Sequence, residues 1–191
     1  MPLLDHFGFL ARFYDRLIGP PSNDTLVRLT ELPIQGLLLD AGGGTGRIAS
    51  RLTGLAGGII LLDASIPMLR QAQAKAGLDP LTGAAERLPF VDACFERIIM
   101  VDAYHHLEHQ NKSLEECWRV LQPGGLLVIE EPDIALAVVK LVALAEKLAL
   151  MRSHFHSGKK IAEALQCLGG NVRIVHERPN LWVVAQKPEL V

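Results

Sequence analysis

The sequence predicts an α/β fold in which helices cover both faces of a doubly wound, mostly parallel sheet. Short apolar runs alternate with helix-like segments along nearly the whole chain, a pattern typical of parallel strands joined by helices. The runs are almost continuously apolar, as expected of strands that are buried on both faces. The last two runs are separated only by a short turn, which predicts an antiparallel hairpin at the C-terminal edge.

In the N-terminal half, we expect helices over residues 7–18, about 23–32, 47–53 and 65–76. The breaker Gly19-Pro20-Pro21 ends the first, and Asn23 or Asp24 is suited to cap the second. The predicted strands span residues 36–39, 58–62 and 78–84. The first two are followed directly by an aspartate, Asp40 and Asp63, and a glycine-rich turn at 42–46 follows the first.

In the C-terminal half, we expect strands over residues 97–101, 126–130, 172–176 and 181–185, and helices over 112–121, 134–151 and 159–168. A turn at 122–125, Gln-Pro-Gly-Gly, ends the first of these helices. The segment 134–151 is rich in Ala, Val and Leu, but Lys140, Glu146 and Lys147 interrupt it. A membrane-spanning helix needs about 20 mostly uncharged residues, so this segment is predicted to be amphipathic.

Length and charge narrow the class of protein. The 191 residues suit one domain, in which residues 1–33 and 132–168 are expected to form a helical cap over the substrate. A formal net charge of −2 disfavours a protein that coats nucleic acid. Three distant cysteines outside any C-x-x-C pair, and an N-terminus without a signal-peptide pattern, favour a cytoplasmic location.

The turn after the first strand belongs to the segment Asp40-Ala41-Gly42-Gly43-Gly44-Thr45-Gly46-Arg47. Glycines allow the backbone to turn sharply and to approach a ligand closely, and in open parallel sheets ligands bind beyond the carboxyl ends of the strands. A dinucleotide motif G-x-G-x-x-G that starts at Gly42 would need its third glycine where Arg47 stands, and no P-loop lysine follows. Asp63 can accept hydrogen bonds from ribose hydroxyls, which leaves both dinucleotides and other nucleosides open.

Four blocks of sequence follow one another along the chain: residues 38–46 (LLDAGGGTG), 61–65 (LLDAS) with Met68, 83–90 (GAAERLPF), and 95–107 (FERIIMVDAYHHL) followed by 119–125 (RVLQPGG). Together they resemble the seven-stranded (class I) S-adenosylmethionine (SAM) dependent methyltransferases, and within them the ubiquinone and menaquinone biosynthesis group (methyltransferase type 11). The resemblance implies a seven-stranded Rossmann-like sheet, SAM as cofactor and S-adenosylhomocysteine as product.

By this resemblance, Asp40 and the glycines surround the methionine part of SAM, and Asp63 holds the ribose. In the third block, Ala84 stands where the family usually has an aspartate that accepts from the adenine amino group. That change removes about 1–3 kcal/mol of binding, although the Ala85 amide can still donate to the ring. The implied cofactor-binding residues are Asp40, Ala41, Gly42, Gly44, Gly46, Asp63, Ala64, Met68, Ala84, Ala85, Asp102 and Tyr14.

Tyr104, His105 and His106 follow the predicted strand 97–101 and are the catalytic candidates. Methyl transfer depends mainly on aligning the acceptor with the methyl group, and a base is needed only if the acceptor must lose a proton. Histidine suits that role near neutral pH, but both histidines are equally compatible with shaping the pocket. His154, His156 and the histidines at 105–109 lack the spacing of a ligand set, so no metal is expected.

The sequence predicts a small-molecule acceptor, hydrophobic or aromatic, such as a quinone precursor, a phenol or a lipid-like molecule. The apolar face of segment 134–151 motivates this prediction, but it is equally compatible with a homodimer contact or core packing. Two alternatives stay open. One is a non-catalytic SAM-binding or scaffold protein with a degenerate pocket, which Ala84 favours. The other is a nucleotide-cofactor oxidoreductase, which Arg47 and the glycine spacing disfavour.

Overall fold

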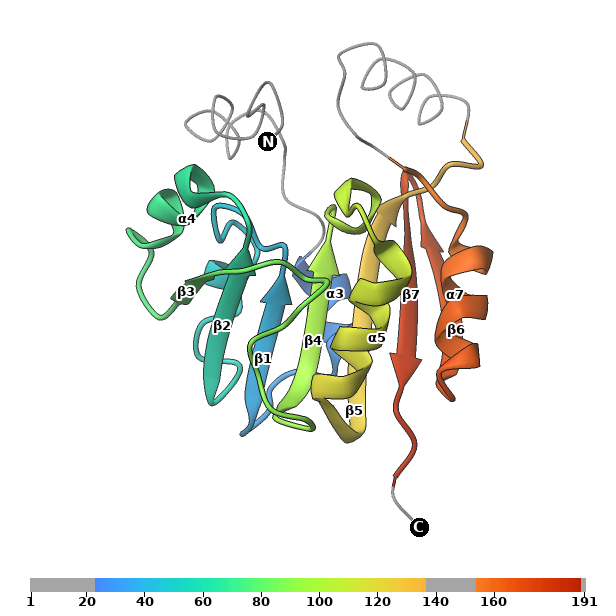
Figure 1. Ribbon diagram of the computed structural model, residues 1–191, viewed down its shortest axis with the longest axis horizontal. Helices are drawn as coiled ribbons and strands as arrows, with labels where there is room; N and C mark the ends of the chain where they lie inside the picture. The colour runs from blue at the N-terminus through green and yellow to red at the C-terminus, as the bar shows by residue number, and fades with distance from the viewer. Residues whose placement is uncertain (1–22, 137–153, 190–191) are drawn as a thin grey trace.

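A computed structural model describes residues 23–136 and 154–189 (Figure 1). The strands form one seven-stranded sheet in the order β3-β2-β1-β4-β5-β7-β6. All neighbouring pairs are parallel except the two that β7 makes, with β5 and with β6. This topology confirms the predicted fold. The strands are β1 (Leu37–Ala41), β2 (Gly58–Asp63), β3 (Asp79–Thr82), β4 (Phe95–Val101), β5 (Leu121–Pro132), β6 (Asn171–Glu177) and β7 (Asn180–Gln186).

Helices pack against both faces of the sheet. Figure 1 shows α5 and α7 in front of the sheet and α3 behind it. In the described ranges, no helix is long and apolar enough to cross a membrane. The helices are α3 (Asn23–Thr30), α4 (Ile66–Ala72), α5 (Gln110–Val120) and α7 (Gly158–Cys167), with short 3-10 turns η1 (Ala49–Arg51) and η2 (Tyr104–His106).

Two apolar cores lie on opposite faces of the sheet. Leu114 of α5 and Leu165 of α7 belong to one core, and Leu29 of α3 belongs to the other. Strand β5 contributes Leu127 and Ile129 to the first core and Leu126 and Val128 to the second. Because successive side chains of a strand point to opposite faces, a strand covered on both sides is apolar at every position, which explains the continuous runs in the sequence.

Two predicted elements differ from the structure. The helix expected over 47–53 is only the 3-10 turn η1, because Arg51 and Leu52 donate to carbonyls three residues back and Gly54 then takes a φ of +83°. The turn expected at 122–125 lies within β5 instead. The register there jumps from Phe95↔Leu121 to Arg97↔Leu126, so these residues bulge from a continuous strand.

The remaining predicted elements are present, with ends that differ by a few residues. The predicted helices over 7–18 and 134–151 are an exception, because residues 1–22 and 137–153 lie outside the described part of the chain. The helical cap over residues 1–33 and 132–168 therefore stays a prediction.

Candidate cofactor and acceptor site

The turn after β1 has a backbone that requires glycine. The φ angle is +77° at Gly42, +54° at Gly44 and +73° at Gly46, a region that side chains with a Cβ rarely occupy. Space is equally restricted: a Cβ on Gly43 would lie 2.6 Å from Oδ2 of Asp40. The glycines therefore let the turn fold tightly over the carboxyl end of β1.

The turn after β1 also touches the segment that follows β4. A Cβ on Gly42 would lie 2.8 Å from the Cβ of Ala103, closer than carbon atoms normally approach. The amide of Gly42 donates to the carbonyl of Leu62 on β2, at 2.7 Å. The glycine turn is thus fixed between the ends of β2 and β4, where the resemblance expects the cofactor.

Asp63 ends β2 and is held against the glycine turn. Its Oδ2 accepts a hydrogen bond from the amide of Gly44 at 2.9 Å, and its Oδ1 accepts from the amide of Ser65 at 2.7 Å. Burial raises the pKa of this carboxyl above its usual range, and backbone donors at Ser65, Gly44 and Ala64 oppose the shift. Each carboxylate oxygen can accept a further bond, so Asp63 is preorganised to bind a diol such as a ribose.

Asp40 lies beneath the turn and is almost fully buried, with 1% of its surface exposed. Burial raises the pKa of its carboxyl to about 7, the nearby Asp63 carboxylate adds to the rise, and Arg47 opposes it. Oδ2 of Asp40 accepts no hydrogen bond within the described residues. Near neutral pH this side chain is therefore poised between its neutral and charged forms.

The third predicted block lies beside the end of β2. The amide of Gly83 donates to the carbonyl of Asp63 at 3.0 Å, which places Ala84 and Ala85 next to the expected ribose position. Ala84 is exposed and Ala85 is buried. Of the residues expected near the ribose, Ala64 is exposed, and Met68 is buried in the first turn of α4.

The three catalytic candidates form η2, directly after β4. The chain turns sharply at Asp102, whose φ is +54° and whose amide donates to the carbonyl of Glu130 at 3.0 Å. Glu131 at the end of β5 then holds η2 with both carboxylate oxygens. Oε1 accepts from the amide of Tyr104 at 2.9 Å, and Oε2 lies 2.7 Å from Nδ1 of His105. Both side chains of the His105–Glu131 pair are 2% exposed.

Aromatic rings gather around η2. The His105 ring stacks on Phe155 with centroids 4.3 Å apart and lies 3.9 Å from His106, while Tyr104 lies 6.4 Å from His156. Burial, with a smaller contribution from His105, lowers the pKa of His106 to about 3. Burial, with a smaller contribution from Glu131, raises the pKa of Tyr104 to about 12. Both groups are therefore neutral near pH 7. Together with His105 and Phe155 they form the aromatic wall of η2.

The prediction from sequence missed Glu130 and Glu131. Glu130 is 3% exposed, and burial raises its pKa to about 7 although the Asn180 side chain donates to it. These two acids stand at the carboxyl end of a buried apolar strand, and ligands of parallel sheets bind at that end. This pattern was the sequence signal that could have identified them. Tyr14 lies outside the described residues, so its predicted contact with the cofactor is untested. Within the described ranges, no group of three or more His, Cys, Asp or Glu is placed to hold a metal ion.

Comparison with known proteins shows which proteins this chain resembles. Residues 39–129 match the sequence model of a family described as "Methyltransferase domain". The ubiquinone/menaquinone biosynthesis C-methyltransferase UbiE of Pectobacterium atrosepticum is 30% identical over 150 residues, which cover 73% of this chain and 57% of that protein. The enzyme of the same name from Brucella anthropi is 36% identical over 112 residues, 53% of this chain and 43% of its own length. The chain thus spans about half the length of these curated relatives.

Solved structures agree on the fold. YcgJ of Bacillus subtilis superposes with a TM-score of 0.76 at 16% identity, covering 88% of this chain and 99% of that chain. A putative methyltransferase of Haloferax volcanii, solved in complex with the Trm112 methyltransferase activator, gives 0.77 at 18% identity, with coverage of 98% and 100%. The [4+2]-cyclase SpnF gives 0.73 at 17% identity, with coverage of 88% and 80%. Residues 39–129 therefore carry a methyltransferase domain, and the relatives of the chain include the UbiE C-methyltransferases. Its seven-stranded sheet has the fold of these solved structures.

Proposed function

We propose that this chain transfers the methyl group of SAM to a small acceptor and releases S-adenosylhomocysteine. The observation that carries this proposal is the glycine turn closed over Asp40 and joined to Asp63 through the amide of Gly44. Glycine lacks a side chain, so a ligand can approach the backbone of the turn closely, and the fixed Asp63 carboxylate provides an acceptor for ribose hydroxyls beside it. The family match supports the same cofactor.

The proposed reaction requires the protein mainly to position its reactants. SAM carries an activated sulfonium methyl group, so the protein mainly aligns the acceptor with that group and excludes water. Asp40 and residues 41–46 are proposed to surround the methionine part, Asp63, Ala64 and Met68 the ribose, and Ala84 and Ala85 the adenine. Asp102 and Tyr14 complete the proposed cofactor site.

The acceptor is proposed to be small and hydrophobic or aromatic, bound against the aromatic wall of η2 and Phe155. Support comes from that wall and from the relatives, whose names specify C-methylation in quinone biosynthesis. Where the acceptor must lose a proton, His105 is the proposed base. Oε2 of Glu131, 2.7 Å from Nδ1 of His105, holds the orientation of the imidazole ring.

A second candidate function is a SAM-binding protein without methyltransferase activity. Ala84 favours it, because an exposed methyl group stands where the family usually has an acid. The same fold also carries other reactions, as the [4+2]-cyclase shows. Binding of SAM without any release of S-adenosylhomocysteine across quinone-like, phenolic and lipid-like acceptors would favour this candidate.

A calorimetric comparison tests the leading proposal. The protein is titrated separately with SAM, S-adenosylhomocysteine and NAD. We expect both SAM and its product to bind and NAD to bind far more weakly, because the third glycine of a dinucleotide motif is replaced by Arg47. Tight binding of NAD without SAM would refute the proposal, and binding of none of the three would favour a scaffold.

Ala84→Asp should tighten SAM binding by about 1 kcal/mol or more, roughly fivefold, because the new carboxylate can accept from the adenine amino group. The measurement is the calorimetric Kd of SAM. Ala76→Asp is the matched control, since it adds the same charge at another exposed alanine. Equal affinities in the wild type and Ala84→Asp would show that this position does not contact the adenine.

A cytoplasmic location, a homodimer and the absence of a nucleic-acid partner stay predictions. Analytical ultracentrifugation of the purified chain, with and without SAM, tests the homodimer.

A further inference from the structure

The segment that carries the proposed adenine contacts has no regular secondary structure. Residues 83–94, between β3 and β4, form turns and irregular backbone throughout. Its start is fixed by the bond from the Gly83 amide to the Asp63 carbonyl, and a turn follows in which the Arg87 amide donates to Ala84. The positions of Ala84 and Ala85 therefore also depend on the contacts that hold the second half of the segment, from Leu88 onward.

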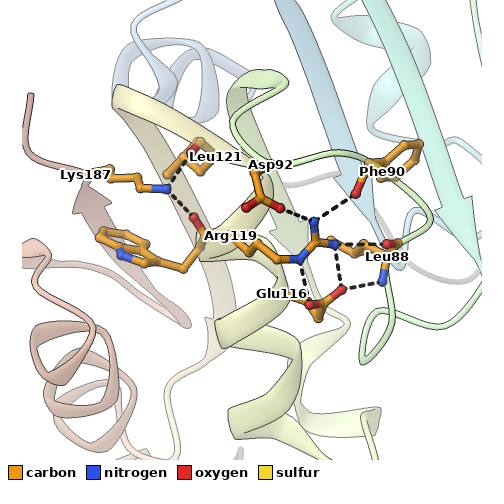
Figure 2. Close-up of polar contacts among 8 residues, drawn as sticks. Leu88, Phe90, Asp92, Glu116, Arg119, Leu121 and Lys187 are labelled. Atoms are coloured by element: carbon orange, nitrogen blue, oxygen red, sulfur yellow. Dashed lines mark hydrogen bonds and ion pairs between the residues drawn. The ribbon is translucent and has the colours of Figure 1, made fainter. Parts of the chain in front are cut away.

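Arg119, in the last turn of α5, holds that far end (Figure 2). Its Nη2 donates to the carbonyl of Leu88 at 3.1 Å, and its Nη1 donates to the carbonyl of Phe90 at 2.9 Å and to Oδ1 of Asp92 at 2.7 Å. A guanidinium has five N–H donors in a rigid fork. Three of them therefore bind one short loop.

Glu116 uses the other two donors and binds the same loop. Its Oε1 accepts from Nε of Arg119 and its Oε2 from Nη2, both at 2.9 Å. Oε2 also accepts from the amide of Leu88 at 2.9 Å. Both the amide and the carbonyl of Leu88 are thereby bound by the Arg119–Glu116 pair. Bonds to Arg119 lower the pKa of Glu116, so the carboxylate stays charged near neutral pH.

The C-terminal end of α5, which carries this pair, is also held in place. On the other side of the same helix end, Nζ of Lys187 donates to the carbonyls of Trp118 and Leu121 at 2.6 and 2.7 Å (Figure 2). These carbonyls lack partners within the helix. Leu88 is 4% exposed and packs into the core beneath α5, so the loop is fixed by its backbone and by its side chain.

We propose that Arg119 and Glu116 are positioning residues for SAM, which hold the adenine-binding segment in register through Leu88. The inference rests on the proposed function. The segment from Ala84 to Arg87 spans two fixed points, Gly83 on Asp63 and Leu88 on Glu116 and Arg119. Loss of the second point leaves the ribose and methionine contacts in place and frees the adenine end.

The test measures the affinity of S-adenosylhomocysteine, and of adenosine as a smaller adenine-bearing probe, in Arg119→Lys and Glu116→Gln. Lysine keeps the charge but cannot reproduce the fork. We expect both variants to weaken S-adenosylhomocysteine about 2- to 30-fold, the range for mutations that act through a network. Adenosine affinity should fall by a similar factor. Glu115→Gln, at the exposed neighbouring position, is the control and should leave both affinities unchanged.

Hydrogen exchange at the Leu88 amide separates positioning from stability alone. Wild-type protein should protect this amide more when S-adenosylhomocysteine is bound, and Glu116→Gln should lose most of the protection while its unfolding midpoint changes little. Asp92→Asn is a milder companion variant, because Asp92 is exposed and binds only one of the five donors. It should weaken S-adenosylhomocysteine less than twofold.

Folded Arg119→Lys and Glu116→Gln proteins that bind S-adenosylhomocysteine as tightly as Glu115→Gln would overturn the inference and leave the proposed function intact. A wild-type protein that binds neither SAM nor its product would instead remove the proposed function and this inference with it.

Discussion

Asp63→Ala is expected to weaken SAM binding at least about tenfold, which corresponds to about 1.4 kcal/mol. Hydrogen bonds to a charged group contribute about 1.5–3 kcal/mol, and the proposed ribose contact relies on this carboxylate. The change also leaves the amides of Gly44 and Ser65 without their acceptor, so the glycine turn loses a second support. Calorimetric titration of SAM measures the effect.

Two companion variants make the Asp63 result interpretable. Asp63→Asn keeps the size and one acceptor oxygen, so its affinity should lie between those of the wild type and Asp63→Ala. Asp79→Ala, at the exposed start of β3, removes an acid from the neighbouring strand and should bind SAM normally. An unchanged affinity in Asp63→Ala, with the fold retained, would show that the ribose is not held there.

Asp40→Asn is expected to remove a pH-dependent loss of stability. The folded protein raises the Asp40 pKa from 3.8 to about 7, so it keeps a proton that the unfolded chain releases. The resulting stabilisation is complete below pH 3.8 and is lost as the pH rises through about 7. Each pKa unit corresponds to about 1.4 kcal/mol. Between pH 5 and 8, the wild type should therefore lose about 2–3 kcal/mol relative to the variant.

Urea unfolding of both proteins at a series of pH values measures this difference. The other buried acid with a pKa of about 7, Glu130, is present in both proteins, so its contribution cancels in the comparison. Asp79→Asn is the exposed control and should follow the wild-type curve. Parallel curves for the wild type and Asp40→Asn would mean that Asp40 titrates in the folded protein as it does in the unfolded chain.

The strands were predictable because their burial leaves a direct mark on the sequence. In β1, β2 and β4 an apolar run leads directly into an aspartate, Asp40, Asp63 or Asp102, so both the strands and their carboxyl ends follow from local pattern. The helix expected after Gly46 was wrong because the apolar pattern does not show that the amides of Arg51 and Leu52 bond three residues back, as in η1. The bulge at 122–125 was missed because a Pro-Gly-Gly turn signal does not show whether the flanking residues remain in one strand.

The site divides in a similar way. Asp40 and Asp63 could be predicted as site residues because each directly follows the apolar run of its own strand. Glu131 contacts His105 across 26 positions and Arg119 contacts Leu88 across 31, so both partnerships depend on the order of strands and helices in space. A single sequence carries no local signal for them, although the resemblance had already singled out the block that contains Arg119.

The contact between Gly42 and Ala103 restricts how the acceptor side of this protein can be diversified. A Cβ on Gly42 would lie 2.8 Å from the Cβ of Ala103, and Ala103 is itself buried, so both positions are closely packed. Libraries aimed at new acceptors should therefore keep residue 103 as alanine or glycine and randomise the neighbouring positions of η2 instead. A bulkier residue at 103 would displace the glycine turn. Such a variant would then bind the methyl donor more weakly, even if its acceptor preference changed as intended.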